Sequence, residues 1–73
     1  MAEFKYEVKE RYGVLSQTER GWTTEVNLIS WNDNPAKIDI RSWSPDHEKM
    51  GKGITLTSAE ARKLKAILEG INK

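Results

Sequence analysis

The sequence of 73 residues contains no cysteine and a single histidine. Without cysteine, neither a disulfide framework nor a thiolate zinc site can stabilise the fold, and His47 alone cannot build a histidine metal cluster. We therefore expect no metal and no cofactor. A chain of this length buries only about 60% of the surface that its unfolded form exposes. Self-association is the remaining route to stability.

Long hydrophobic runs are missing as well. The amino-terminal residues alternate charged and apolar side chains, and none of the apolar stretches is long enough for a signal peptide or a membrane span. This pattern predicts a cytoplasmic protein that does not enter the membrane.

An excess of charge of one sign is the third absence. Twelve Lys and Arg residues face eleven Asp and Glu residues, which leaves a net charge of +1. A strongly basic domain is the usual mark of nucleic-acid binding. Any positive surface on this protein must therefore arise from the way in which folding sorts its side chains.

Alternating apolar and polar residues predict a strand near the amino terminus. Phe4, Tyr6 and Val8 alternate with charged residues, so this strand should bury one face. The pattern resumes beyond Gly13, which we expect to mark a bulge or bend.

Three further strands are expected after the polar loop 16–21. Residues 22–31 and 37–43 should form a hairpin, because the intervening Asn-Asp-Asn-Pro segment is rich in turn formers. A short strand, 54–56, follows a loop that opens at Ser44 and closes with Gly51-Lys52-Gly53.

A helix should complete the fold. Thr57 and Glu60 have the spacing of a capping box, and apolar residues then recur at helical spacing. This stripe consists of Ala61, Leu64, Ile67, Leu68 and Ile71. The predicted fold class is α+β: a four-stranded antiparallel sheet followed by one C-terminal amphipathic helix, in a single domain spanning 1–73.

The strand 37–43 divides its side chains between two faces. Ile38 and Ile40 lie on one face, which we expect to be the buried one together with Val26 and Leu28. Trp22 shares that face and should belong to the core. The opposite face carries Lys37, Asp39, Arg41 and Trp43.

Two interpretations of that opposite face stay open. Trp31 and Trp43 can be core or dimer anchors, as tryptophans in small domains often are, and Arg41 can simply pair with Asp39 or Glu25. Alternatively, aromatic rings beside basic residues suit an unpaired nucleic acid, because rings stack on bases and cations follow the phosphates.

Catalytic patterns are missing. His47 lies in a charged loop without a nucleophile motif, and the carboxylates of Asp46 and Glu48 lie in the same loop, where solvation is more common than acid–base work. The Gly-Lys-Gly segment lacks the spacing of a phosphate-binding loop. We expect no catalytic residues and no enzymatic activity.

The segments KIDIRSW and KMGKGITL, followed by an amphipathic helix, resemble the transcriptional coactivator family known as positive cofactor four. The string GWTTEVNLISWN is similar to the small bacterial YdbC-type members of that family. The similarity covers residues 21–68. It implies a curved sheet, a homodimer closed through the helix, and binding of single-stranded DNA with little sequence preference, in transcription regulation or in DNA repair and recombination. Association with the nucleoid would fit this role.

The resemblance also implies which residues act. Arg41 corresponds to the strand arginine that contacts the DNA backbone, and Lys49 and Lys52 to lysines of the glycine-rich turn. The predicted nucleic-acid-binding residues are Trp31, Lys37, Arg41, Trp43, Lys49 and Lys52. Dimer contacts are expected from Leu64, Leu68 and Ile71.

Two departures from the family pattern affect the expected binding. Thr24, Glu25 and Asn27 stand where the family carries basic residues, and Pro35 and Ala36 stand where its hairpin carries a lysine. Both changes predict weaker phosphate contact, greater reliance on stacking and a shallower salt dependence.

Other functions remain possible from the sequence. A protein-interaction adaptor could use exposed tryptophans as anchors for transcription or repair proteins. Single-stranded RNA is a further candidate ligand, because stacking and phosphate contacts do not read the 2′-hydroxyl group.

Overall fold

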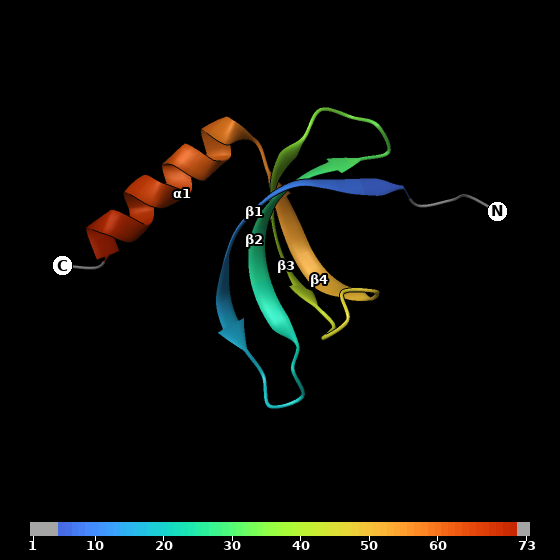
Figure 1. Ribbon diagram of the computed structural model, residues 1–73. Coiled ribbons are helices and arrows are strands. Elements are labelled where there is room, and N and C mark those ends of the chain that lie inside the picture. Colours follow the sequence, from blue (N-terminus) through green and yellow to red (C-terminus); the bar gives the residue numbers. More distant parts are fainter. Residues whose placement is uncertain (1–4, 72–73) are drawn as a thin grey trace.

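The computed structural model describes residues 5–71. Four antiparallel strands form one sheet in the order β1-β2-β3-β4, and a helix follows (Figure 1). This arrangement confirms the predicted architecture of four strands and one C-terminal helix. The elements are β1 (Tyr6–Gln17), β2 (Thr23–Trp31), β3 (Lys37–Trp43), β4 (Met50–Leu56) and α1 (Ser58–Ile71).

The β2–β3 hairpin is the regular centre of the sheet. Residues 23–29 pair with 37–43 without a register shift. The connecting turn holds Asn32 and Asp33 at φ values of 50° and 64°, a left-handed conformation that Asn and Asp tolerate better than most residues. The predicted hairpin and its turn are confirmed.

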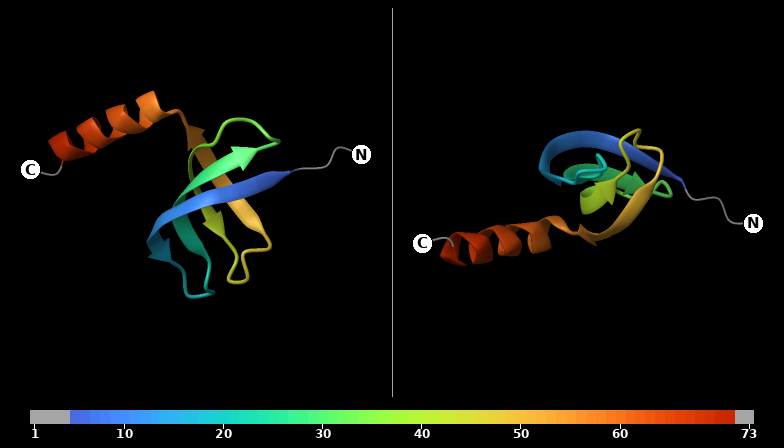
Figure 2. Two further views of the ribbon diagram at one scale, coloured as in Figure 1. Left: turned by 45° about the horizontal axis from the view of Figure 1, so that its top comes forward. Right: turned by 90° about the horizontal axis from the view of Figure 1, so that it is seen from below.

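β1 ends at Gln17, two residues beyond the predicted Leu15, and is more irregular than the sequence pattern indicated; the predicted strand residue Phe4 lies outside the described residues. Its pairing with β2 shifts register between Val8 and Glu10, between Arg11 and Gly13, and between Val14 and Ser16. Each shift bends the strand and increases its twist. As a result β1 crosses over the sheet instead of lying flat beside β2 (Figure 2). The expected irregularity near Gly13 is confirmed, and two further shifts accompany it.

The curvature of the sheet brings strands together that are not neighbours. The ring centroid of Tyr6 on β1 lies 5.8 Å from that of Trp43 on β3, although β2 separates these strands. In a flat sheet these two strands would be about 9–10 Å apart, and the two residues would also be offset along the strands, because Tyr6 pairs with Trp31 at one end of β2 and Trp43 pairs with Thr23 at the other. The face that carries these two rings is therefore the inner, concave face of the sheet.

The concave face is also the better buried one, and the prediction that the apolar face forms the core is wrong for the single chain. Ile29 is 0% exposed and Trp43 2%, and both lie on the concave face. The polar residues Glu25, Asn27 and Asp39 are buried there too. The expected core residues Val26, Leu28, Ile38 and Ile40 lie on the opposite, convex face and are only half-buried. A curled sheet encloses its inner face, whereas its outer face needs a separate cover.

β4 begins at Met50 and not at Ile54 as predicted, so Gly51 and Gly53 belong to a strand. A Cβ atom at Gly53 would clash with Arg41 and with the carbonyl oxygen of Ile40, and one at Gly51 would clash with the Ser42 hydroxyl. The glycines are needed because β3 lies too close to leave room for side chains at these positions. The sequence pattern alone indicated a turn here and not a strand.

α1 begins with the predicted capping box. The Thr57 backbone N–H donates to Glu60 Oε1 at 2.9 Å, and the Glu60 N–H donates to Thr57 Oγ1 at 3.1 Å. These two bonds satisfy donors that the first turn of a helix otherwise leaves unpaired. Within residues 5–71, no helix is long and apolar enough to cross a membrane.

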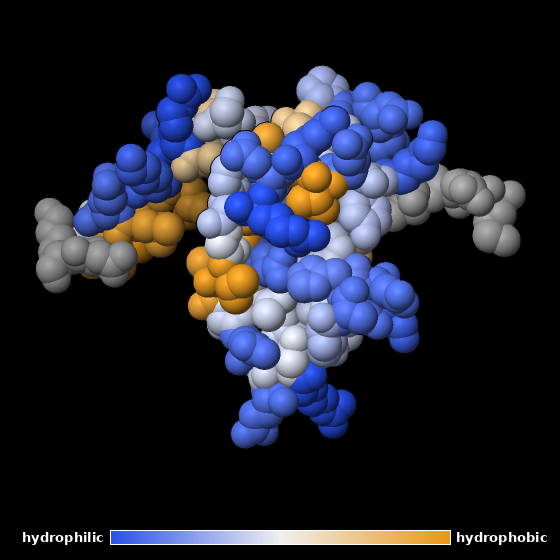
Figure 3. Space-filling model, viewed as in Figure 1, coloured by the Kyte–Doolittle hydropathy of each residue, from blue (hydrophilic) through white to orange (hydrophobic). Residues whose placement is uncertain are grey.

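The helix extends away from the sheet (Figure 1). Leu64 is half-buried, whereas Leu68 is 47% exposed and Ile71 68%. Figure 3 shows hydrophobic residues along the lower edge of α1 and hydrophilic residues along its upper edge. An open groove of about 610 Å³ lies between α1 and the sheet, and both α1 and the convex face line it.

Candidate nucleic-acid interface

Three aromatic rings gather on the concave face. The Tyr6 ring lies 5.5 Å from the Trp31 ring and 5.8 Å from the Trp43 ring, both in tilted arrangements. Trp31 ends β2 and Trp43 ends β3, so the two indoles come from opposite ends of the hairpin. Tyr6 bridges them because β1 crosses the sheet at this point. The sequence did not indicate Tyr6 as a site residue, since the alternating pattern of β1 predicted only that it belongs to a buried face.

Arg41 and Trp31 are brought into direct contact. The guanidinium carbon of Arg41 lies 4.8 Å from the centre of the Trp31 ring, a favourable cation–π distance. The same guanidinium donates to both carboxylate oxygens of Asp39, at 2.7 and 3.0 Å. Asp39 also accepts a hydrogen bond from Thr55 at 3.1 Å. Arg41 is thus a partly buried cation that is paired with Asp39. The Asp39 carboxylate reduces the positive charge that Arg41 gives to the concave face.

A second polar cluster surrounds Glu25. Its carboxylate accepts hydrogen bonds from Thr23 Oγ1 at 2.6 Å and Asn27 Nδ2 at 3.3 Å, and Arg11 lies 3.5 Å away. Burial raises the pKa of Glu25, but the hydrogen bonds from Thr23, His47 and Asn27 outweigh burial and hold the pKa below its ordinary value. Glu25 therefore carries a negative charge on the concave face at neutral pH.

His47 is part of this cluster and is not the solvated loop residue that the sequence indicated. Its Nε2 atom lies 2.7 Å from Glu25 Oε2, and its ring is 5.9 Å from that of Trp43. A φ value of 61° at His47 turns the loop between β3 and β4 back onto the sheet. The sequence held no signal for this contact, which joins residues 22 positions apart.

The loop that carries His47 has its own hydrogen bonds. Asp46 accepts from the Ser44 hydroxyl at 2.6 Å and from the Glu48 backbone N–H at 3.0 Å. These bonds lower the pKa of Asp46. The Lys49 N–H donates to Ser44 Oγ at 3.0 Å. These local polar contacts therefore fix the loop conformation and the backbone position of Lys49, just before β4.

The predicted lysines lie around this face without meeting one another in a single cluster. Lys37 begins β3 and shares the side of Arg41 by strand alternation, and its side chain is exposed. Lys49 and Lys52 are also exposed and flank the start of β4. Lys52 lies in a bulge, where Gly51 and Lys52 of β4 lie opposite the single residue Ser42 of β3, between the pairs Arg41–Gly53 and Trp43–Met50.

Two buried polar atoms of the concave face have no hydrogen-bond partner within residues 5–71. They are Nε1 of Trp43 and Oδ1 of Asn27. An unmade hydrogen bond of this kind costs about 1–3 kcal/mol. The concave face thus retains one donor and one acceptor that the fold itself leaves unused. No group of three or more His, Asp or Glu residues in the described part of the chain is arranged to hold a metal ion.

Comparison with known proteins places these features in a family. Residues 18–67 match the family described as Transcriptional Coactivator p15 (PC4). An uncharacterized protein of Treponema pallidum (strain Nichols) is 50% identical over 70 residues, which cover 96% of this chain and 82% of the relative. The matched region contains β2, β3, β4 and most of α1. The chain therefore belongs to the PC4 family of transcriptional coactivators.

Proposed function

We propose that the protein binds single-stranded DNA on its concave face, as a homodimer and with little sequence preference. PC4 is a nucleic-acid-binding, non-enzymatic family, and membership suggests single-stranded DNA binding and a role related to transcription. The observation that supports the proposal most directly is the contact of Arg41 with Trp31 beside Trp43. A cation and aromatic rings at one place suit phosphates and unstacked bases together.

Each predicted site residue has a role in this proposal. Trp31 supplies ring surface for bases, the buried Trp43 supports the aromatic cluster from below, and Arg41 approaches the DNA backbone next to Trp31. The exposed lysines Lys37, Lys49 and Lys52 extend the contact to further phosphates. A duplex hides its base faces, so a curved aromatic face of this kind should prefer unpaired strands.

The charges on the face set the expected salt dependence. Asp39 pairs with Arg41, and Glu25 is buried next to the aromatic rings, so the positive potential is smaller than the number of cations indicates. Each phosphate contact contributes about −0.7 to the slope of log affinity against log salt for single strands. We expect a slope smaller than the four contacts of Lys37, Arg41, Lys49 and Lys52 would give.

The homodimer is proposed from the apolar surfaces. Convex-face residues and α1 line an open groove in the single chain, and the large apolar residues Ile67, Leu68 and Ile71 of α1 are exposed. A second copy of the chain would cover both, with Leu64, Leu68 and Ile71 in the contact. Burying such surface contributes about 25 cal/mol per Å², which a small domain needs.

Tryptophan fluorescence tests the proposal. Titration with oligothymidine of about twenty nucleotides should quench emission, because bases stack on indole rings. The corresponding duplex should quench weakly, and raising salt from about 50 to about 200 mM should weaken the single-strand signal. Equal affinity for duplex and single strand, or no binding of either, would contradict the proposal. Oligouridine of the same length decides between DNA and RNA.

The adaptor alternative loses support from the geometry. It requires exposed tryptophans as anchors, but Trp43 is buried and Trp31 is half-buried. We therefore keep single-stranded DNA as the proposed ligand, and we propose the cytoplasm, including the nucleoid, as its location.

A further inference from the structure

The three rings of the concave face differ in how far they reach solvent. Trp43 is 2% exposed, and Tyr6 is 37% exposed. Trp31 lies between them in exposure, and the Arg41 guanidinium lies over its ring. The residue with the largest exposed fraction of the three thus belongs to β1, outside the hairpin that carries both tryptophans.

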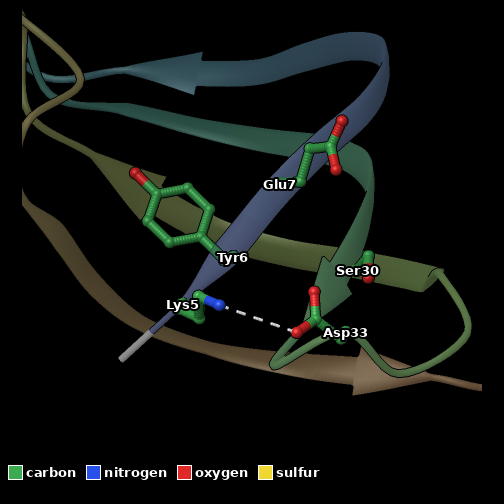
Figure 4. Close-up of a pocket in the computed structure, with 5 residues that line it drawn as sticks. All are labelled: Lys5, Tyr6, Glu7, Ser30 and Asp33. Atoms are coloured by element: carbon green, nitrogen blue, oxygen red, sulfur yellow. Dashed lines mark ion pairs between the residues drawn. The ribbon is translucent and has the colours of Figure 1, made fainter. Parts of the chain in front are cut away.

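The position of Tyr6 places it above the indoles. Its ring contacts both Trp31 and Trp43, with separations in the range of favourable aromatic pairs. In Figure 4 the Tyr6 ring and the Glu7 carboxylate extend from β1 in different directions, as neighbouring strand residues do. A base on Tyr6 would therefore continue the aromatic layer without approaching the Glu7 carboxylate.

We propose that Tyr6 is a base-stacking residue and that an unpaired nucleobase meets its ring before it reaches Trp43. The inference rests on the proposed single-strand binding and extends it to β1. Trp43 then acts mainly as the floor beneath Tyr6, and the accessible stacking surface consists of Tyr6 and Trp31. Any unpaired base fits, because every base has a π face.

Substitutions at Tyr6 separate stacking from packing. Tyr6→Leu keeps an apolar side chain over the indoles but removes the ring, so affinity for oligothymidine should fall about tenfold. Tyr6→Phe and Tyr6→Trp keep the ring and should stay within about twofold of the unsubstituted protein. Tyr12→Leu is the matched comparison, because Tyr12 is also on β1 and is 51% exposed, but it lines a cavity with Glu25 and His47 instead of the two indoles. Its affinity loss should be clearly smaller than that of Tyr6→Leu.

Photochemical crosslinking detects direct contact between Tyr6 and a base, which would not occur if Tyr6 only packed against the indoles. Oligothymidine carrying 5-iodouracil should crosslink to Tyr6 in the unsubstituted protein, and mass spectrometry should locate the adduct in the peptide that contains it. Crosslinks at Trp31 without any at Tyr6 would overturn the inference, as would equal affinity losses in the Tyr6→Leu and Tyr12→Leu variants. If the unsubstituted protein binds no oligothymidine, the proposed function itself fails. If it binds and Tyr6→Leu binds equally well, only this inference fails.

Discussion

The guanidinium of Arg41 lies over the Trp31 ring, 4.8 Å from its centre, while it pairs with both carboxylate oxygens of Asp39. Arg41 is thereby held by an aromatic ring and an anion at once. This arrangement keeps the guanidinium oriented on the concave face, and it links the stability of the sheet to the proposed binding surface.

Replacing Trp31 with Ala should weaken binding of oligothymidine by about 1–3 kcal/mol, because a stacking surface is lost. Trp31→Phe should retain most of the affinity. Fluorescence anisotropy of a labelled oligonucleotide measures both. Trp22→Phe serves as the control, since Trp22 shares the face of Val26 and is outside the proposed interface. A larger loss in the control than in Trp31→Ala would contradict this assignment.

Asp39→Asn should destabilise the fold by about 3 kcal/mol, because it removes one charge of a buried pair. Urea unfolding followed by circular dichroism gives the free energy. Asp33→Asn is the matched change at an exposed residue that pairs only loosely with Lys5, at 3.7 Å. It should stay within about 0.5 kcal/mol. Similar values for the two variants would show that the Asp39–Arg41 pair does not stabilise the sheet.

The pH dependence of stability should reflect Glu25. Its pKa in the folded protein lies below the ordinary value of 4.5, so its contribution is present above about pH 4.5 and is lost as pH falls through the lower, folded-state pKa. Thermal unfolding between about pH 3 and pH 7 measures this loss. Glu25→Gln should flatten the acid limb of the curve. An unchanged acid limb in that variant would assign the effect to other carboxylates.

Gly53→Ala should destabilise the protein by about 1–3 kcal/mol, since the new Cβ meets Arg41 and the Ile40 carbonyl oxygen. Gly13→Ala is a matched control, because nothing lies within 4 Å of a Cβ at Gly13. Its free energy of unfolding should change by less than about 0.5 kcal/mol. Equal effects of the two substitutions would argue against the close approach of β3 and β4.

Leu68→Glu should convert the proposed homodimer into monomers, because a carboxylate would enter an apolar contact. Sedimentation equilibrium measures the mass directly. Arg62→Glu, on the same helix, changes charge outside the groove and should leave the dimer intact. A monomeric unsubstituted protein at high micromolar concentration would rule out the homodimer itself.

Regular elements could be predicted from the sequence because their signals are local. Strand alternation identified the β2–β3 hairpin, and the Thr57–Glu60 pair identified the start of α1. The buried face could not be predicted in the same way, since it depends on curvature. Apolar patterning favoured the face of Ile38 and Ile40, whereas the bends in β1 enclose the opposite one.

The residues of the candidate site likewise divide into those that the sequence indicated and those that depend on the fold. Arg41 and Trp31 could be identified from their shared face and from the family resemblance. Tyr6 and His47 could not, because their contacts join distant segments through a curved strand and a loop with positive φ. The sequence offered the pairing of Arg41 with Asp39 as one of two interpretations, because strand alternation places both residues on one face.

The register shifts of β1 have a consequence for association between sheets. β1 is an edge strand, and a long regular edge offers unpaired backbone groups to any other strand. Because β1 changes register at three places, a foreign strand cannot pair along its whole length. The bends that shape the concave face should therefore also protect this edge of the sheet from edge-to-edge aggregation.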